Sequence, residues 1–252
     1  MKILTDREAL TKEERPIIDR FLAAEYQARE KRRVDHLLKM SGIKRVKRIE
    51  DFDWKFNPKV PRDKIMELMN TEWLQKTCNI VIIGPAGVGK THIADALCVD
   101  AIMKGQQAVS ISIFDLTAKL SKARNVYNLI DYYARVKVLC LDEMGYVFPT
   151  KEQADSIFQI ISKRSEIGTT IVTTNLIPSQ WGKIFDSVTA SAILDRLGLN
   201  GLQLGRDVAA VYPTISVMKL WGTCVVGIVL LFNVVVITEF YTGTEYGPVK
   251  HV

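Results

Sequence analysis

One short stretch of the chain holds residue types suited to binding phosphate groups. It reads Gly84-Pro-Ala-Gly-Val-Gly-Lys90-Thr91 and matches the pattern GxxxxGK[ST] at every required position. Glycines allow backbone N–H groups to turn toward phosphates, the lysine reaches the β- and γ-phosphates, and the threonine hydroxyl binds Mg²⁺. We therefore predict a site for Mg-ATP. Its phosphate-binding residues are expected to be Gly84, Pro85, Ala86, Gly87, Val88, Gly89, Lys90 and Thr91, with Thr91 also a metal ligand.

A pair of carboxylates supplies the second half of this chemistry. The apolar run from Val138 to Leu141 ends in Asp142 and Glu143. Asp142 is expected to hold Mg²⁺, and Glu143 to orient and deprotonate the water that attacks the γ-phosphate. The alternative is two acids that cap a strand at the surface. The phosphate-binding pattern upstream favours the catalytic interpretation.

Asn175 is a third candidate. It closes the apolar and threonine-rich stretch 171–174. In an open α/β sheet the carboxyl ends of the strands line the ligand crevice, so Asn175 is expected to position the attacking water. A plain strand-to-loop turn explains this asparagine almost as well.

These side chains need a scaffold, and the pattern of the chain predicts one. Apolar runs typical of strands alternate with segments of helical period, which favours parallel strands joined by helical crossovers. We therefore predict an α/β fold, a three-layer P-loop NTPase with a parallel sheet. Expected strands cover residues 79–84, 108–113, 138–142 and 169–174, and expected helices cover 90–104, 115–133 and 151–166.

The N-terminal region, residues 1–48, is expected to be helical and basic, with the helix ending at Gly42. Residues 29–48 contain nine Lys/Arg and two acids. This stretch is either a solvated helix face or a surface that contacts DNA phosphates. The chain of 252 residues has a net charge of +6, which weakly favours a polyanionic partner. Its four cysteines and three histidines show no zinc spacing, and a reduced, cytoplasmic domain is expected.

The C-terminal region, residues 201–252, differs from the rest. Residues 220–238 carry no charge and are mostly apolar. That length suits a membrane-spanning helix, so we predict a hydrophobic C-terminal helix and a possible membrane anchor. A buried pair of strands is the alternative. The expected division is therefore 1–48, 49–200 and 201–252.

Over about residues 10–197 the sequence resembles the IstB-like ATP-binding proteins, AAA+ proteins that assist insertion-sequence transposases and are related to DnaC helicase loaders. The stretches that carry the resemblance are Ile49–Trp54, Gly84–Ala94, Leu141–Tyr146, Thr173–Leu176 with Gln180–Gly182, and Ala192–Leu197. It implies a five-stranded parallel core, ATP-driven assembly on DNA and a transposase or helicase partner. It also implies that Arg196 is an arginine finger that acts on a neighbouring copy in a homo-oligomer. Without the resemblance, Arg196 would be read as one member of a surface salt bridge.

The resemblance ends after Leu197. The family's second phosphate-sensing arginine has no counterpart in the residues that follow Leu197. The tail is similar to a fragment of membrane-integral, ion-pumping pyrophosphatases, without the acidic sites that pumping needs. We therefore expect an ATP-hydrolysing protein that assists DNA transposition. The alternatives are a helicase loader, a fusion product that binds ATP without turnover, and a membrane-tethered ATPase.

Overall fold

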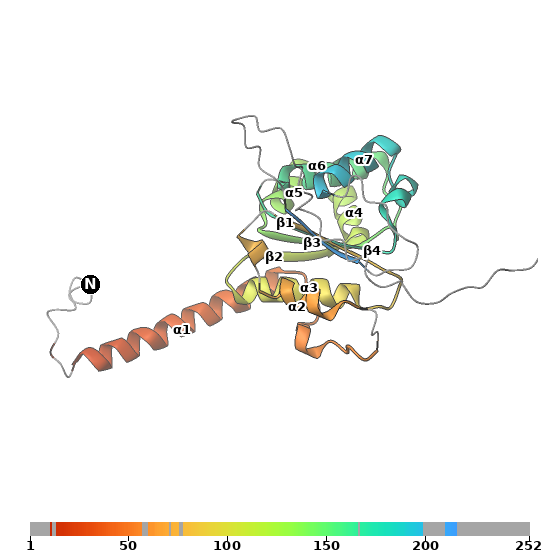
Figure 1. Cartoon of the computed structure of the whole chain (residues 1–252). Helices are drawn as coiled ribbons and strands as arrows, with labels where there is room; N and C mark the ends of the chain where they lie inside the picture. The colour runs from red at the N-terminus through yellow and green to blue at the C-terminus, as the bar shows by residue number, and fades with distance from the viewer. Residues whose placement is uncertain are drawn as a thin grey trace, which may run out of the picture.

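The computed structural model describes residues 11, 14–56, 60–70, 72–75, 78–165, 167–198 and 210–215. Its central feature is a five-stranded sheet with helices on both faces (Figure 1). The strands are β1 (Cys78–Ile83), β2 (Ala108–Ser112), β3 (Val138–Met144), β4 (Thr169–Thr174) and β5 (Ala210–Ile215). The helices are α1 (Glu14–Met40), α2 (Arg62–Leu68), α3 (Lys90–Met103), α4 (Ile113–Lys122), α5 (Val126–Arg135), α6 (Lys151–Arg164) and α7 (Ser187–Leu197). Three short 3₁₀ helices are η3 (Ile49–Asp51), η4 (Glu72–Leu74) and η5 (Pro178–Lys183).

The strand order is β2-β3-β4-β1-β5. The first four strands run parallel, with Ile80 paired to Ile171 and Ala108 paired to Val138. The fifth strand pairs antiparallel with β1. The expectation of four crossover-linked strands is therefore confirmed, and the expectation of a fifth parallel strand is wrong. Strand β5 follows α7 in the chain and lies at the edge of the sheet, where an otherwise parallel sheet often carries an antiparallel strand.

Alternation of side chains along each strand divides the core into two layers. Val81 and Ile83 face one apolar cluster, which α4, α5, α6 and α7 cover. Ile80 and Ile82 face the other cluster, which α2, α3 and the connector after α1 cover (Figure 1). Burial of both faces explains why the strands read as continuous apolar runs in the sequence. The three-layer P-loop NTPase architecture predicted from the sequence is confirmed.

The prediction of a single helix over residues 115–133 is wrong, because the structure has two helices there. Helix α4 begins after Ser112, whose hydroxyl accepts the Asp115 N–H at 3.1 Å. Helix α5 begins after Asn125, whose side-chain oxygen accepts the Asn128 N–H at 3.1 Å. The side chain of an asparagine hydrogen-bonds to nearby backbone groups, which interrupts a continuous helix and favours the start of a new one.

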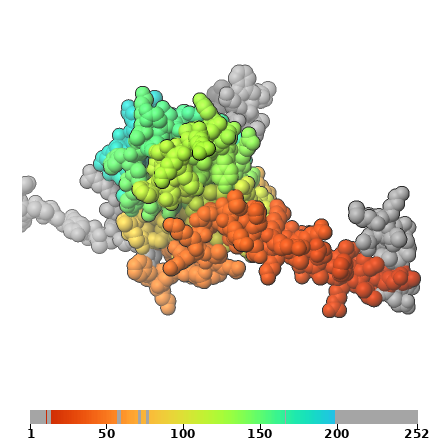
Figure 2. Space-filling model, turned by 180° about the vertical axis from the view of Figure 1, so that it is seen from behind, coloured from red at the N-terminus to blue at the C-terminus, as the bar shows by residue number. Residues whose placement is uncertain are grey.

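Helix α1 projects from the body of the protein (Figures 1 and 2). It ends at Met40, and Gly42 follows with a left-handed φ of 76°, as expected. The carbonyl of Ser41 accepts the Ser110 N–H at 2.7 Å, so the chain after α1 lies along the edge strand β2. The division of the chain at residues 48 and 200 stays a prediction.

The predicted hydrophobic helix and membrane span, residues 220–238, lie outside the described residues. The same is true of the segment that resembles a pyrophosphatase. Among the residues that the structure describes, no helix has the length and apolar character that crossing a membrane requires.

Candidate nucleotide-binding site

The glycine-rich loop lies between the carboxyl end of β1 and the first turn of α3. Gly84 N–H donates to the carbonyl of Thr174 at 3.1 Å, which fixes the start of the loop against β4. Gly89 precedes α3 with a φ of 91°, and a Cβ added there would lie 2.5 Å from the ring of Phe52. The loop therefore needs glycine at this position for both its backbone angle and its space.

Lys90 is the first residue of α3 and is buried, with 8% of its surface exposed. Its ammonium donates to the carbonyl of Pro85 at 2.7 Å, so the side chain folds back over its own loop. Burial lowers the pKa of Lys90, and the carboxylates of Asp142 and Glu143 counteract that shift. The structure thus brings together the lysine and the two acids that the sequence placed far apart.

Thr91 and Asp142 meet between α3 and β3. The threonine hydroxyl donates to both oxygens of the Asp142 carboxylate, at 3.0 and 3.1 Å. Asp142 is buried, whereas Glu143 beside it is exposed. A hydroxyl and a carboxylate are the oxygen donors that a hard cation such as Mg²⁺ prefers. The two residues expected to bind a metal are therefore adjacent.

An irregularity in the sheet separates the two acids. Leu141 pairs with Val172 and Met144 pairs with Thr174, so Asp142 and Glu143 together lie opposite a single residue of β4. Glu143 has a φ of 61°, unusual for a residue with a side chain. Bulges of this kind redirect side chains next to active sites. Here the bulge exposes Glu143 and leaves Asp142 inside.

Asn175 follows the end of β4 and is exposed. A Cβ added at Gly145 would lie 2.9 Å from its side-chain oxygen, so Asn175 contacts the loop that begins after Glu143. The carbonyl of Thr174, the last residue of β4, accepts the Gly84 N–H. Asn175 thus lies at the same end of the sheet as the phosphate-binding loop and the acid pair.

The connector before α2 contacts the site in a way that the sequence did not reveal. The ring of Phe52 lies edge-on to His92, with centroids 5.2 Å apart, and 4.7 Å from the ring of Trp54. A ring nitrogen of His92 lies 2.9 Å from the carbonyl oxygen of Arg48. These contacts join the first turn of α3 to the end of the basic segment. The phenylalanine and tryptophan in Ile49–Trp54 were the available signal.

Asp95 is a buried carboxylate one turn after Thr91, and no motif in the sequence marks it as part of the site. Its carboxylate accepts the hydroxyl of Ser110 at 3.0 Å. Burial raises the pKa of Asp95, the Ser110 bond lowers it, and the charge of Asp142 raises it further. The acid pair at the end of β3 therefore has a third acidic neighbour on α3.

Arg196 lies at the opposite end of the sheet. Its carbonyl accepts the side-chain amide of Asn79 at 3.0 Å, and Asn79 is near the start of β1 whereas the glycine-rich loop follows its end. Strand geometry puts those two points about 16 Å apart. The side chain of Arg196 is half exposed and pairs with Asp195 at 3.5 Å. The structure therefore does not bring Arg196 to the phosphate-binding loop of its own chain.

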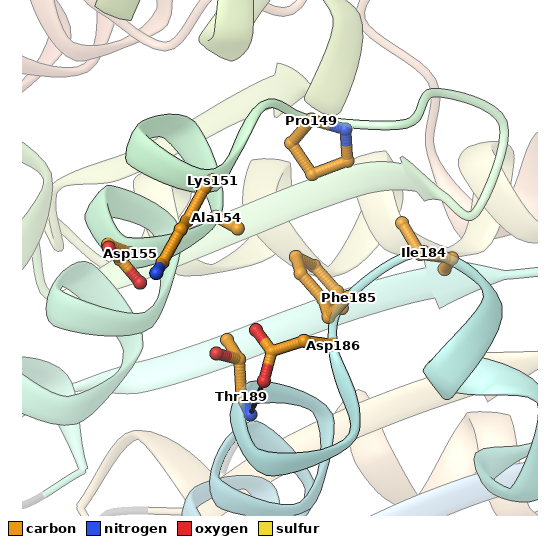
Figure 3. A pocket seen from close by; sticks show the side chains of 8 residues that line it. All are labelled: Pro149, Lys151, Ala154, Asp155, Ile184, Phe185, Asp186 and Thr189. Atoms are coloured by element: carbon orange, nitrogen blue, oxygen red, sulfur yellow. Dashed lines mark hydrogen bonds between the residues drawn. The ribbon is translucent and has the colours of Figure 1, made fainter.

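A cavity of about 440 Å³ opens between the first turns of α6 and α7 (Figure 3). Ile184 and Phe185 form part of its wall, and Lys151 and Asp155 lie at its rim. Asp186 is used as the N-cap of α7, because its carboxylate accepts the N–H groups of Val188 and Thr189. None of the residues predicted for the nucleotide site lines this cavity.

The parallel sheet, the glycine-rich loop before α3 and the acids at the end of β3 define a P-loop nucleotide-binding protein. The family model described as IstB-like ATP binding protein matches residues 4–201. The chain therefore belongs to the family of IstB-like ATP-binding proteins.

Curated relatives agree with this assignment. The chain is 36% identical over 180 residues to the IS21 insertion-sequence ATP-binding protein of Pseudomonas aeruginosa, covering 70% of this chain and 68% of the relative. It is 35% identical over 182 residues to the IS5376 ATP-binding protein of Geobacillus stearothermophilus, covering 71% and 72%. The matched part of the family model ends at residue 201, so the resemblance of the later tail to a pyrophosphatase has no support from it.

Solved structures share the fold. The crystal structure of DnaI superposes with a TM-score of 0.50 at 20% sequence identity, covering 61% of this chain and 87% of that one. A DNA replication initiation factor superposes with a TM-score of 0.50 at 17% identity, covering 60% and 46%. At this level of identity the similarity establishes the architecture and nothing about partners.

Proposed function

We propose that the chain hydrolyses ATP with Mg²⁺ and uses the cycle to assist DNA transposition. The observation that carries the hydrolysis proposal is the contact between Thr91 and Asp142, with Glu143 next to it on the bulge of β3. This arrangement places a hydroxyl, a buried carboxylate and an exposed carboxylate beside the glycine-rich loop. A protein that only bound nucleotide would have no need of the exposed second acid.

The residues present fit both ATP and Mg²⁺. Gly87 and Gly89 both have positive φ values, of 80° and 91°, so the loop adopts backbone angles that other residues rarely take. The N-terminus of α3 follows directly, and helix N-termini favour anions. The donor set of Thr91 and Asp142 consists of oxygen atoms, as Mg²⁺ requires. Bound Mg²⁺ would neutralise charge that develops on the phosphates.

Each residue then has a separate task. Lys90 would exchange its bond with the Pro85 carbonyl for phosphate oxygens, and Thr91 and Asp142 would hold the metal. Glu143 is exposed toward solvent, where it can orient a water molecule and accept its proton. Asn175 lies close enough to the Gly145 loop to help position that water. Binding and hydrolysis should therefore depend on different residues.

The link to transposition rests on the relatives. The curated proteins that match most of this chain are ATP-binding proteins of insertion sequences. We infer the same setting for this chain, with a transposase as the protein partner. No specific observation favours a helicase-loader function, because the similarity to DnaI is a similarity of fold alone.

DNA is the proposed second partner, and the basic segment 29–48 is the proposed contact. Lys44, Arg45 and Arg48 are exposed where the chain leaves α1. Arg32 and Arg33 already donate hydrogen bonds within the chain, to the Glu25 carboxylate and to the carbonyl of Gly105 respectively. The bond between His92 and the carbonyl of Arg48 joins this segment to the helix of the phosphate-binding loop. Occupation of the nucleotide site can therefore influence the segment through one turn of α3.

Two substitutions test the hydrolysis proposal. Lys90→Ala should abolish binding of a fluorescent ATP analogue, because the loop loses its only lysine. Glu143→Gln should keep binding and lower turnover by at least about a hundredfold, because it removes the base and leaves the phosphate site intact. Equal turnover by Glu143→Gln and the parent chain would refute the role of Glu143. Tight binding by a parent chain that does not turn over ATP would support the nonproductive alternative.

A further inference from the structure

Thr173 contacts both members of the acid pair. It lies in β4 opposite the bulge and is 1% exposed. Its hydroxyl donates to the Asp142 carboxylate at 2.5 Å. The same oxygen accepts the backbone N–H of Glu143 at 2.9 Å. The Thr173 hydroxyl thus donates a hydrogen bond to the side chain of Asp142 and accepts one from the backbone of Glu143.

The bulge explains why a side chain is needed here. In a regular parallel ladder the N–H of Glu143 would find a backbone carbonyl of the neighbouring strand. The extra residue in β3 breaks that alternation between Leu141 and Met144. An N–H removed from water without a partner costs about 1–3 kcal/mol, and the site of this N–H is partly buried. The Thr173 hydroxyl supplies the missing acceptor and so stabilises the bulge together with the positive φ of Glu143.

Thr173 lies in a fully buried part of β4. The preceding residues of β4, Ile171 and Val172, are completely buried. Valine has nearly the shape of threonine, and burying a hydroxyl costs free energy unless it is hydrogen-bonded. The hydroxyl at residue 173 is therefore explained by its two bonds to the acid pair and not by packing.

We propose that Thr173 is a positioning residue for catalysis, which holds Asp142 at the metal site and turns Glu143 outward toward the attacking water. The proposal rests on the hydrolysis proposed above. Thr91 also donates to Asp142, and a metal at that site would engage the oxygen atoms of both residues. Thr173 approaches Asp142 from the neighbouring strand, so its bond can persist while the metal is held.

Three variants of full-length protein test this role. Thr173→Val removes the hydroxyl and keeps the shape, and Thr173→Ser keeps the hydroxyl. Thr169→Val is the matched control, because Thr169 is an equally buried threonine at the other end of β4, 3.5 Å from the carbonyl of Trp73. Each variant is assayed for kcat, for KM, and for binding of a fluorescent ATP analogue with magnesium and with EDTA.

Thr173→Val should lower kcat by about ten- to a hundredfold, the effect of losing one hydrogen bond to a charged group. It should also lose most of the gain in nucleotide affinity that magnesium gives, with little change in the affinity measured in EDTA. Thr173→Ser should restore both properties. Values for Thr173→Val that match those of Thr169→Val, or a failure of serine to rescue, would overturn the proposal.

The binding measurement separates this inference from the proposed function. If the parent chain does not hydrolyse ATP, hydrolysis is refuted, and the magnesium-dependent part of the affinity still tests the bond to Asp142. If the parent hydrolyses ATP and Thr173→Val keeps the full kcat and the full magnesium effect, hydrolysis stands and the role of Thr173 is refuted.

Discussion

The two ends of the parallel sheet each hold a buried cation, and the chain treats the two differently. At the carboxyl end, Lys90 makes one hydrogen bond, to the carbonyl of Pro85, and lies near two carboxylates. At the amino end, Arg164 is completely buried and donates to the carbonyls of Tyr133, Val136 and Thr169 at 2.7, 2.6 and 2.5 Å. Lys90 has donors left for a ligand, whereas Arg164 donates to these backbone carbonyls and, through Nε, to the Thr170 hydroxyl at 3.1 Å.

This difference separates a binding lysine from a structural arginine. Burial lowers the pKa of Arg164 to about 9, so the guanidinium keeps its charge at neutral pH. Its planar fork joins the end of α5, the loop before β3 and the start of β4. The amino end of the sheet is thereby fixed. The half-exposed Arg196 lies at that same end, so any action on a phosphate group would have to be at the site of a neighbouring copy.

The largest expected effect concerns Arg196. If it acts on a neighbour's γ-phosphate, Arg196→Ala should lower ATP turnover by about a thousandfold or more without weakening nucleotide binding. Mixing Arg196→Ala chains with Lys90→Ala chains should restore part of the activity, because one intact site can then form between two different copies. The measurement is the ATPase rate across mixing ratios. Activity that stays flat across those ratios contradicts a shared site.

The second prediction sets the two buried cations against each other. Arg164→Met should lower the free energy of unfolding by about 3 kcal/mol, because several buried carbonyls lose their donor at once. Lys90→Met should change it by less than about 1 kcal/mol, because only the exposed-loop carbonyl of Pro85 loses a bond. Urea unfolding followed by circular dichroism measures both. Equal destabilisation by the two changes would remove the distinction between the two ends.

The third prediction concerns the aromatic contact at the glycine-rich loop. Gly89→Ala should weaken nucleotide binding by about tenfold, because the new Cβ meets the ring of Phe52 and the residue must keep a φ of 91°. Gly87→Ala is the control for backbone angle alone, since it has a φ of 80° and nothing within 4 Å of its added Cβ. Titration with a fluorescent ATP analogue distinguishes them. Equal losses would show that the Phe52 contact is irrelevant.

The smallest expected effect concerns the basic segment 29–48, which covers the end of α1 and the connector that follows it. If the basic segment contacts DNA phosphates, the affinity for duplex DNA should fall with salt, with a logarithmic slope of about −0.9 per contact. Replacing four exposed cations of the segment with glutamine should flatten that slope by up to about 3.6. The four are Lys31, Lys39, Lys44 and Arg45.

The control for that experiment removes the same charge elsewhere. It replaces four exposed lysines outside the segment: Lys55, Lys122, Lys151 and Lys183. Because net charge changes equally in both variants, a specific contact predicts a flatter slope in the first variant alone. A slope that changes equally in both would identify the segment as a solvated helix face.

The sequence by itself determined the parts of this protein that depend on local pattern. Four strands and the glycine-rich loop follow from apolar runs and from a spacing that few other folds use. Asp142 and Glu143 could be identified because they follow a buried strand directly. These features depend on residues that are close together in the chain. Hydrophobic periodicity and motif spacing therefore reveal them.

Tertiary structure alone decided which distant residues meet. Thr173 reads as one threonine among several, and its role depends on a bulge in another strand. Phe52 lies against Gly89, and Arg164 is enclosed by carbonyls of α5 and β4, because the sheet and its crossovers fold those segments together. A hydrogen bond between two strands does not change the hydrophobic pattern of either strand. The sequence therefore does not reveal it, and the geometry of the site depends on the fold.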